Sequence, residues 1–524
     1  LWRMTVSHRR LLQWQTAAQA ERGSGGLAAH LRAMWPGMLL GLLLLFLSPA
    51  VIGRSAGLLW LLSPLTGAAL ALPTRRSAPL TAGDRAYLRS AAADTFRYYT
   101  AFCTAEDHYL PPDNVQEQPP TGTAHRTSPT NIGMALASYT AAADLGFLPR
   151  EEALVCQGRL LDTLEVLPRC RGHFYNWYDT RSLEPLRPPF VSTVDSGNLY
   201  AALLTVRAAA AETGADALVR RLDALMAPMD FSFLYDSDRG LFHICYDGEN
   251  ERCVGGWYDL LASEAMLTSF LAIAKGDVPI KHWRRLSRAQ VQKDGYRGLA
   301  SWSGTMFEYL MPGLFLPLYP GSLLRESSRF CLYVQKRRIP AGQPWGISES
   351  AFFSLDPGRC YRYKAHGCAA LALKRGQVTE LVVSPYSSFL ALAIDPSGAL
   401  RNLRRLERFG ARGRFGFWEA LDFTPSRCRR ERGEPVRCYM AHHVGMSLLA
   451  AANVLCDDSI RRRFLAAAPL RAHRLLLQER LPDSGVVIRR DAAPTPEKPP
   501  RPGADRWQLR GRGDEAERLC LLSN

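Results

Sequence analysis

Two long stretches without charged residues stand near the beginning of the chain. Residues 33–53 and 55–74 contain no Asp, Glu, Lys or Arg, and Arg54 alone separates them. Each stretch is close to the roughly 20 residues that a membrane-spanning helix needs. The pattern predicts a transmembrane helical hairpin over residues 33–74, with its connection at Arg54.

Basic residues flank this predicted hairpin on both outer sides. Arg3, Arg9, Arg10, Arg22 and Arg32 precede it, and Arg75, Arg76, Arg85 and Arg89 follow it. Basic flanks remain on the cytoplasmic side of a membrane, so both ends of the hairpin are expected there. A cleaved signal peptide and a helix pair buried in a soluble domain are the alternatives.

Beyond residue 80 the apolar positions mostly recur at helical spacing, which predicts a series of amphipathic helices. Short extended pieces interrupt them, at 174–178 and in a hairpin around 236–240. Many helices, with the informative residues in the loops between them, suggest a closed ring of helices whose loops meet at one end. The predicted helices cover residues 85–103, 130–145, 151–167, 197–211, 259–275, 322–338, 386–409 and 440–455.

Composition narrows the classes of protein. The 524 residues are 47% hydrophobic and 10% aromatic, which excludes disorder as the main state. The net charge of +16 comes from Arg residues scattered along the chain, which disfavours a nucleic-acid partner and suits anionic lipid. The 12 Cys include no C-x-x-C pair, so neither a metal site nor a cofactor is predicted.

Three lone carboxylates in apolar surroundings are the clearest candidates for chemistry, because burying an unused charge is costly. Glu264 is the only charged residue between Leu260 and Ala274, and helical spacing places it on an apolar face. Glu308 and Glu349 are equally isolated, in SWSGTMFEYLMP and PWGISESAFF. A buried acid that pairs with Arg or caps a helix is the alternative for each.

Tryptophans accompany acids along the chain. Flat aromatic faces beside carboxylates are what a glycan cleft needs, and two carboxylates that flank a glycosidic bond can hydrolyse or transfer it. His442 begins an apolar helix and could contact substrate or cap that helix. The candidate substrate-binding residues are Trp177, Asp179, Asp195, Trp257, Trp302, Glu308, Trp345, Glu419 and His442.

With these motifs assembled, the chain resembles the transglycosylating, ring-closing domain of cyclic β-1,2-glucan synthases, a glycoamylase-like domain related to endo-β-1,2-glucanases. The resemblance covers residues 80–482, and the two apolar stretches resemble the membrane segments that precede that domain. The matching motifs are LPPDNVQE, HRTSPTNIG, FYNWYDTRSLEPL, VSTVDSGNL, YDLLASEAMLTSFLAIAKGDVP, SWSGTMFEYLMP, WGISESAF and YMAHHVGMS.

The resemblance implies an all-α fold, an (α/α)6 barrel with short β insertions, that acts on β-1,2-glucan by retaining transglycosylation. It assigns the acid/base role to Glu264 and the nucleophile role to Glu349. It further implies anchoring in the bacterial inner membrane, with the catalytic domain facing the cytoplasm. Membrane lipid and a separate glucan-polymerising glycosyltransferase are the implied partners.

The chain departs from the family pattern at two places, Val444 and the HGCA segment 366–369. Two alternatives to ring closure stay open. One is an endo-β-1,2-glucanase, in which water reaches the same site, and the other is a non-catalytic glucan-binding remnant. The expected organisation is a basic segment at 1–32, the hairpin at 33–74, the barrel at 80–482 and a Pro-rich tail at 483–524.

Overall fold

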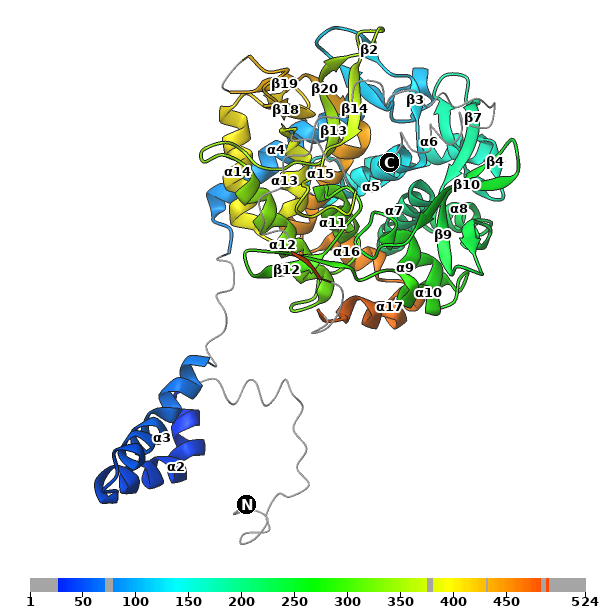
Figure 1. Cartoon of the computed structure of the whole chain (residues 1–524). Coiled ribbons are helices and arrows are strands. Elements are labelled where there is room, and N and C mark those ends of the chain that lie inside the picture. Colours follow the sequence, from blue (N-terminus) through cyan, green and yellow to red (C-terminus); the bar gives the residue numbers. More distant parts are fainter. Residues whose placement is uncertain (1–26, 71–78, 375–379, 430–431, 482–486, 490–524) are drawn as a thin grey trace. The chain divides into compact units, whose positions relative to one another are not determined.

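The computed structural model describes residues 27–70, 79–374, 380–429, 432–481 and 487–489, and two compact units divide the chain (Figure 1). The first unit is Leu1–Ala78 and the second is Pro79–Asn524. Most of the predicted basic segment and of the Pro-rich tail lies outside the described residues. The predicted domain boundaries stay predictions.

The first unit contains a helical hairpin, made by α2 (Leu27–Leu47) and α3 (Val51–Leu70). The two helices approach closely at Gly41 and Gly57, where an added Cβ would lie 2.7 and 2.6 Å from the carbonyl oxygen of the other glycine. Large apolar side chains cover the outside, and among the described residues α2 is the helix that is long and apolar enough to cross a membrane. A helix pair therefore forms, and its insertion stays a prediction.

The connection of this hairpin differs from the prediction. It lies at residues 48–50, and Arg54 belongs to the first turn of α3. The Arg54 Nε donates a hydrogen bond of 3.0 Å to the Ser48 carbonyl, just past the end of α2. A cation is favourable at the carbonyl end of a helix, which explains why Arg54 lies beside the turn without forming it.

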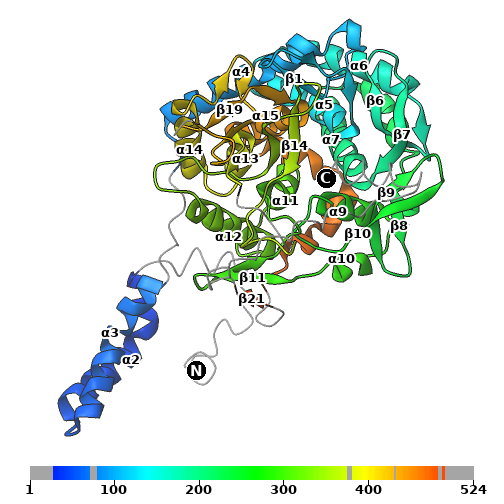
Figure 2. The same ribbon diagram turned by 45° about the horizontal axis from the view of Figure 1, so that its top comes forward.

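Helices are the main regular structure of the second unit, and Figures 1 and 2 show several of them around a common centre. Helix α5 packs against α7 and α15, α7 packs against α9, and α13 packs against α11 and α15. The α-helices are α4 (Ala82–Phe102), α5 (Pro129–Asp144), α6 (Arg150–Val166), α7 (Thr193–Glu212), α8 (Asp216–Met226), α9 (Met266–Lys275), α10 (Lys281–Arg285), α11 (Met306–Leu310), α12 (Leu323–Arg338), α13 (Pro385–Ala391), α14 (Pro396–Arg408), α15 (Ala441–Leu455), α16 (Ser459–Phe464) and α17 (Ala468–His473).

Local signals explain where these helices begin and where two predictions were wrong. Ser128 caps α5 and Ser192 caps α7, each by accepting a backbone N–H of the first turn. The predicted helix 386–409 is two helices, because Pro396 cannot continue α13 and Asp395 caps α14 instead. The predicted helix 259–275 begins only at Met266, so Glu264 lies in the preceding turn and not on a helix face.

Short strands are inserted between the helices, as the predicted fold with short β insertions expects, and most of them have two to four residues. The largest sheet has six strands in the order β10-β9-β7-β6-β3, with β8 paired to β9. The predicted hairpin at 236–240 is confirmed as β8–β9, with Gly240 at φ 73° in its turn. The strands of this sheet are β3 (Arg126–Thr127), β6 (Asn176–Asp179), β7 (Pro185–Ser192), β8 (Tyr235–Asp236), β9 (Leu241–Asp247) and β10 (Arg252–Tyr258).

Smaller sheets join segments that are distant in sequence. Strand β1 pairs with β20, and the hairpin β13–β14 places Glu349 opposite Ala365. One apolar core underlies the helices and most of these strands. The remaining strands are β1 (Asn114–Gln116), β2 (Gly122–Thr123), β4 (Arg169–Cys170), β5 (His173–Phe174), β11 (Gln290–Lys293), β12 (Tyr296–Leu299), β13 (Glu349–Leu355), β14 (Tyr361–Ala365), β15 (Val382–Val383), β16 (Arg412–Gly413), β17 (Gly416–Phe417), β18 (Ala420–Asp422), β19 (Glu434–Val436), β20 (Cys438–Met440) and β21 (Val487–Arg489).

Candidate active site

A cavity of about 590 Å³, here called the main cavity, collects the candidate residues. Its wall includes residues at the N-terminal ends of α5, α7, α11 and α15, together with β1, β13 and β14. Helix N-termini carry partial positive charge and free N–H groups, so this end of the helices suits polar and anionic groups. Six predicted site residues line the cavity: Trp177, Asp179, Asp195, Glu264, Glu349 and His442.

Glu264 enters the main cavity from the turn before α9. Burial among protein atoms raises the pKa of its carboxyl group to about 8, and the nearby charges of Glu308 and Glu349 add to the shift. A carboxylic acid that keeps its proton near neutral pH can donate it to a leaving group. Glu264 therefore has the properties of a general acid.

Glu349 begins β13 and faces the same cavity. Burial raises the pKa of its carboxyl group to about 7, although a hydrogen bond from Tyr363 favours the ionised form. The Tyr386 hydroxyl donates to the Glu349 carbonyl at 3.0 Å, which holds the start of the strand. Glu349 is thus more readily ionised than Glu264, as a nucleophile next to an acid must be.

A polar network continues from Tyr363 to the far wall of the main cavity. The Tyr363 hydroxyl lies 3.4 Å from His442 Nε2, and His442 Nδ1 lies 3.2 Å from the Asn131 amide oxygen. The Asn131 amide donates to Asp113 at 3.1 Å, and Asp113 also accepts from Arg126. Burial lowers the pKa of His442 to about 3, so its imidazole is neutral. A neutral imidazole that donates from Nδ1 to the Asn131 oxygen offers only a lone pair at Nε2, so the single Tyr363 hydroxyl proton can bind either Nε2 or Glu349, and not both at once.

Sequence reasoning missed Tyr363, Asn131 and Asp113 as members of this site. Asp113 and Asn131 stood inside motifs quoted for the resemblance, and that position was the available signal. Tyr363 carried no such signal, and it alternates with basic residues in YRYKA. Its position beside Glu349 follows from the pairing of β13 with β14.

Glu308 is buried and does not line the main cavity. Its carboxylate accepts hydrogen bonds from the Ser303 and Thr305 amides, at 2.9 and 2.8 Å, and from the hydroxyl groups of Ser301 and Thr305. With Thr305 it forms the capping box of α11. Glu308 is therefore a buried acid that caps a helix, which was the alternative to a chemical role for this residue.

Glu419 is also buried outside the lining of the main cavity. Its carboxyl oxygens lie 2.9 and 3.1 Å from His443 Nδ1, and one of them accepts the Ala351 amide at 3.3 Å. The His443 ring stacks on Tyr386, with centroids 3.6 Å apart. Glu419 therefore supports the strand that carries Glu349, from behind the cavity wall.

The predicted site residues Trp257, Trp302 and Trp345 do not line the main cavity either. Trp257 donates its indole N–H to Asp236 at 3.0 Å, and Trp302 is 58% exposed on the surface. Trp345 is buried beneath Lys336. The aromatic lining instead comprises Trp177, Phe307, Tyr361 and Tyr363.

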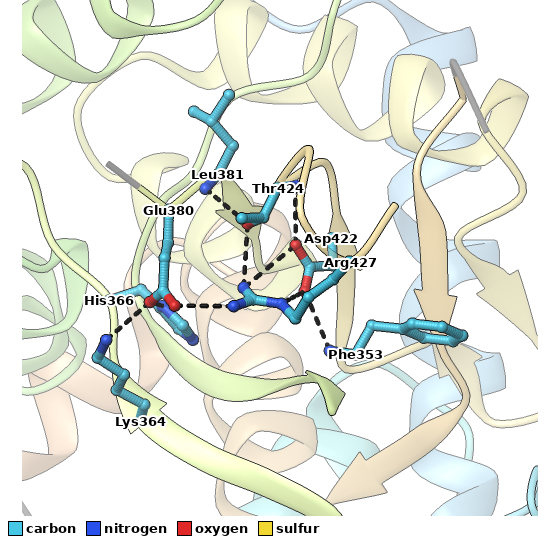
Figure 3. Close-up of polar contacts among 8 residues, drawn as sticks. All are labelled: Phe353, Lys364, His366, Glu380, Leu381, Asp422, Thr424 and Arg427. Carbon is cyan, nitrogen blue, oxygen red and sulfur yellow. Dashed lines mark hydrogen bonds and ion pairs between the residues drawn. The ribbon is translucent and has the colours of Figure 1, made fainter. Parts of the chain in front are cut away.

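A cluster of ionic groups, here called the hairpin clamp, holds β13–β14 from outside the cavity (Figure 3). Glu380 accepts from Lys364 at 2.8 Å, from His366 at 3.1 Å and from Arg427 at 2.8 Å. These hydrogen bonds hold the pKa of Glu380 well below its ordinary value. The HGCA departure thus supplies His366 to this clamp and not to the main cavity.

Asp422 forms the second half of the clamp. It accepts the Arg427 Nε at 2.7 Å and the backbone amide of Phe353 at 3.1 Å. Each strand of the hairpin is therefore tied to a carboxylate, β14 through Lys364 and β13 through Phe353. Since Glu349 and Tyr363 lie on these strands, the clamp positions both groups of the site.

The raised pKa of Glu264 predicts how stability responds to its replacement. An acid whose pKa is higher in the folded chain, about 8 against 4.5, loses stability as the pH rises between these values. The Glu264→Gln variant carries no charge there. Its free energy of unfolding in urea should match that of the wild type below pH 4.5 and equal or exceed it above about pH 8.

Glu249→Gln, which alters a surface ion pair with Arg187, is the control and should change the free energy of unfolding by less than about 1 kcal/mol. A Glu264→Gln variant that is less stable at both pH values would identify Glu264 as a structural hydrogen-bond or ion-pair partner.

Among the residues that the structure describes, no group of three or more His, Cys, Asp or Glu side chains is arranged to hold a metal ion. The carboxyl, imidazole and hydroxyl groups of the main cavity suit proton transfer and attack at carbon.

Comparisons with known proteins agree with this geometry. Residues 256–468 match the Glycoamylase family model, described as "Putative glucoamylase". In an alignment 622 positions long, the chain is 34% identical to the cyclic beta-(1,2)-glucan synthase NdvB of Rhizobium meliloti (strain 1021). That alignment covers 92% of this chain and 22% of the relative, so the chain spans about a fifth of the length of the relative.

Solved structures show the same helix-rich fold at low sequence identity. An endo-beta-1,2-glucanase from Chitinophaga pinensis, in complex with sophorotriose and glucose, is 16% identical with a TM-score of 0.61, over 76% of this chain and 98% of that one. An endo-beta-1,2-glucanase from Talaromyces funiculosus, in complex with sophorose, is 14% identical with a TM-score of 0.59, over 77% and 95%. The chain is thus similar to the Glycoamylase family over residues 256–468, and to a cyclic β-1,2-glucan synthase over 92% of its own length.

Proposed function

We propose that this chain cleaves a β-1,2-glucan and transfers the released glycosyl group to a 2-hydroxyl of the same glucan, closing a ring. Glu349 is the nucleophile and Glu264 is the acid/base of a retaining mechanism. The observation that carries the proposal is that both carboxyl groups line one cavity, with pKa values raised to about 7 and about 8. Near neutral pH this order leaves Glu349 the more ionised and Glu264 the more protonated.

In the first step Glu349 bonds to the anomeric carbon while the glycosidic bond breaks, and the Glu264 proton moves to the departing oxygen. In the second step Glu264 takes the proton of the acceptor hydroxyl, whose oxygen displaces Glu349 and restores it as a carboxylate. The Tyr363 hydroxyl lies beside both Glu349 and the neutral His442, and donation of its proton to Glu349 moderates the charge of that carboxylate. Trp177 and Tyr361 offer flat faces to the sugar rings.

The helices of the second unit are proposed to close as an (α/α)6 barrel with inserted strands. The contacts of α15 with α5, α5 with α7, α7 with α9, α11 with α13 and α13 with α15 support this arrangement. The likeness of fold to the endo-beta-1,2-glucanases supports it as well.

The hairpin α2–α3 is proposed to anchor the chain in membrane lipid of the bacterial inner membrane, with the catalytic domain in the cytoplasm. Its apolar outer surface and the basic residues on both flanks support this placement. A glucan-polymerising glycosyltransferase is proposed to supply the substrate. Retention of the chain in the membrane after carbonate extraction tests the anchoring.

Product analysis separates ring closure from its two alternatives. The full chain is incubated with linear β-1,2-glucan, and the products are examined by mass spectrometry, with Glu349→Gln as the inactive control. We expect rings, each lighter by one water than the linear glucan of the same length. Short linear glucans with new reducing ends would indicate an endo-β-1,2-glucanase, and unchanged glucan would indicate a non-catalytic remnant.

A further inference from the structure

A second cavity, of about 550 Å³, adjoins the main cavity at the ring of Tyr361, which lines both. We call it the Phe353 cavity. Phe353 and Leu355 of β13 form one part of its wall, and Gln118, Glu434 and Arg437 form another. Its volume is close to that of the main cavity.

The lining of the Phe353 cavity has the chemistry that a sugar requires. The Phe353 and Tyr361 rings lie with centroids 6.1 Å apart at an angle of 39°, and both are only partly buried. Arg437 donates a hydrogen bond to the Gln118 side chain at the same wall. Aromatic faces bind the C–H faces of glucose, and amide and guanidinium groups bind its hydroxyls.

A hydrogen bond from the backbone amide fixes the backbone of each of these two residues. The Tyr361 amide donates to the Gln116 side chain at 2.9 Å, and the Phe353 amide donates to Asp422 in the hairpin clamp. Figure 3 shows the Phe353 ring directed away from the clamp ions. A ring whose backbone is fixed loses little freedom on binding, which suits a preformed sugar platform.

Phe353 stands four residues beyond Glu349 on the same strand. At a rise of about 3.4 Å per residue the two positions are at most about 14 Å apart, since the pairing of β13 is irregular between Ala351 and Leu355. A sugar at Phe353 is therefore remote from the bond that is cleaved at Glu349, and one glucan chain that passes Tyr361 can occupy both cavities.

We propose that the Phe353 cavity binds glucose units of the same β-1,2-glucan chain that is being cleaved at Glu349. This inference rests on the proposed function and adds a remote site to it. Holding the chain at a second point keeps its distal part near the cleavage site, which favours transfer within one chain over release of the chain.

The test measures glucan binding to the full chain in the Glu349→Gln background, where turnover does not consume the ligand. Isothermal titration calorimetry gives dissociation constants for long linear β-1,2-glucan and for a β-1,2-linked tetrasaccharide. Phe353→Ala and Arg437→Ala are added separately, and Leu475→Ala, at a side chain 71% exposed on the surface, is the control. Thermal unfolding of each variant verifies that it is folded.

We expect Phe353→Ala and Arg437→Ala each to raise the dissociation constant of the long glucan roughly three- to tenfold. Binding of the tetrasaccharide and all binding by Leu475→Ala should stay unchanged. Equal weakening of both ligands, or no weakening of the long glucan, would overturn the remote site while leaving the proposed function intact. If the parent protein bound neither ligand, the proposed function would fail first.

Discussion

The Glu349→Gln variant is expected to lose turnover of every β-1,2-glucan, by on the order of 10⁴-fold or more in kcat. The amide cannot form the bond to the anomeric carbon that the carboxylate forms. Glu264, the other glutamate of this cavity, has its pKa raised to about 8 and stays largely protonated near neutral pH. Initial rates of product formation from linear glucan measure the loss.

The Glu264→Gln variant should behave differently, because an acid/base acts on the leaving group and on the acceptor. It should stall on natural glucan but still react with a glucoside whose leaving group needs no protonation. Azide should then replace the missing base and yield a β-glycosyl azide. Since Glu264 must be protonated to assist a natural leaving group, kcat/KM of the wild type for natural glucan should fall above about pH 8, whereas first-step cleavage of the activated glucoside should not need this proton.

Azide rescue of Glu349→Gln, in place of Glu264→Gln, would exchange the two roles. Glu308→Gln is the matched third variant, because Glu308 is buried nearby but caps α11 outside the main cavity. If Glu308→Gln alone were inactive while still folded, and both other variants kept activity, the chosen pair would be wrong.

Replacing Arg427 with methionine should destabilise the folded chain by about 3–5 kcal/mol, because it leaves a buried carboxylate without its cation. The Asp422 side chain has 0% exposure and would keep hydrogen bonds from backbone amides alone. Glu380 would lose one of its three donors. Urea unfolding of the full chain in detergent, followed by tryptophan fluorescence, measures the loss.

Arg187→Met is the control, because Arg187 is 85% exposed and its ion pair with Glu249 is on the surface. It should cost less than about 1 kcal/mol. A similarly small cost for Arg427→Met would mean that the clamp is not needed for stability. If the clamp positions the hairpin, Arg427→Met should also lower kcat more than it raises KM at temperatures where the variant is folded.

Several parts of the fold could be predicted from the sequence because they depend on neighbours along the chain. Apolar spacing predicts α5, α7, α12 and α15 to within a few residues, and in the structure a Ser caps each of the first three. The start of α9 was misplaced, since the turn before it is set by the contact of Leu260 with Ser287. No local pattern encodes such a contact.

The sequence by itself determined that Glu264 and Glu349 are exceptional, because an isolated acid in an apolar segment is visible without any structure. It could not separate them from Glu308, whose capping partners are close in sequence but whose burial away from the cavity depends on the packing of α11. Only the tertiary structure decided that Tyr363 lies beside Glu349 and that His442 and Asn131 continue the network from it, from three distant segments. The physical reason is that a pKa or an orientation depends on what lies across the cavity, and the strand pairing and helix packing of the whole domain bring those groups together.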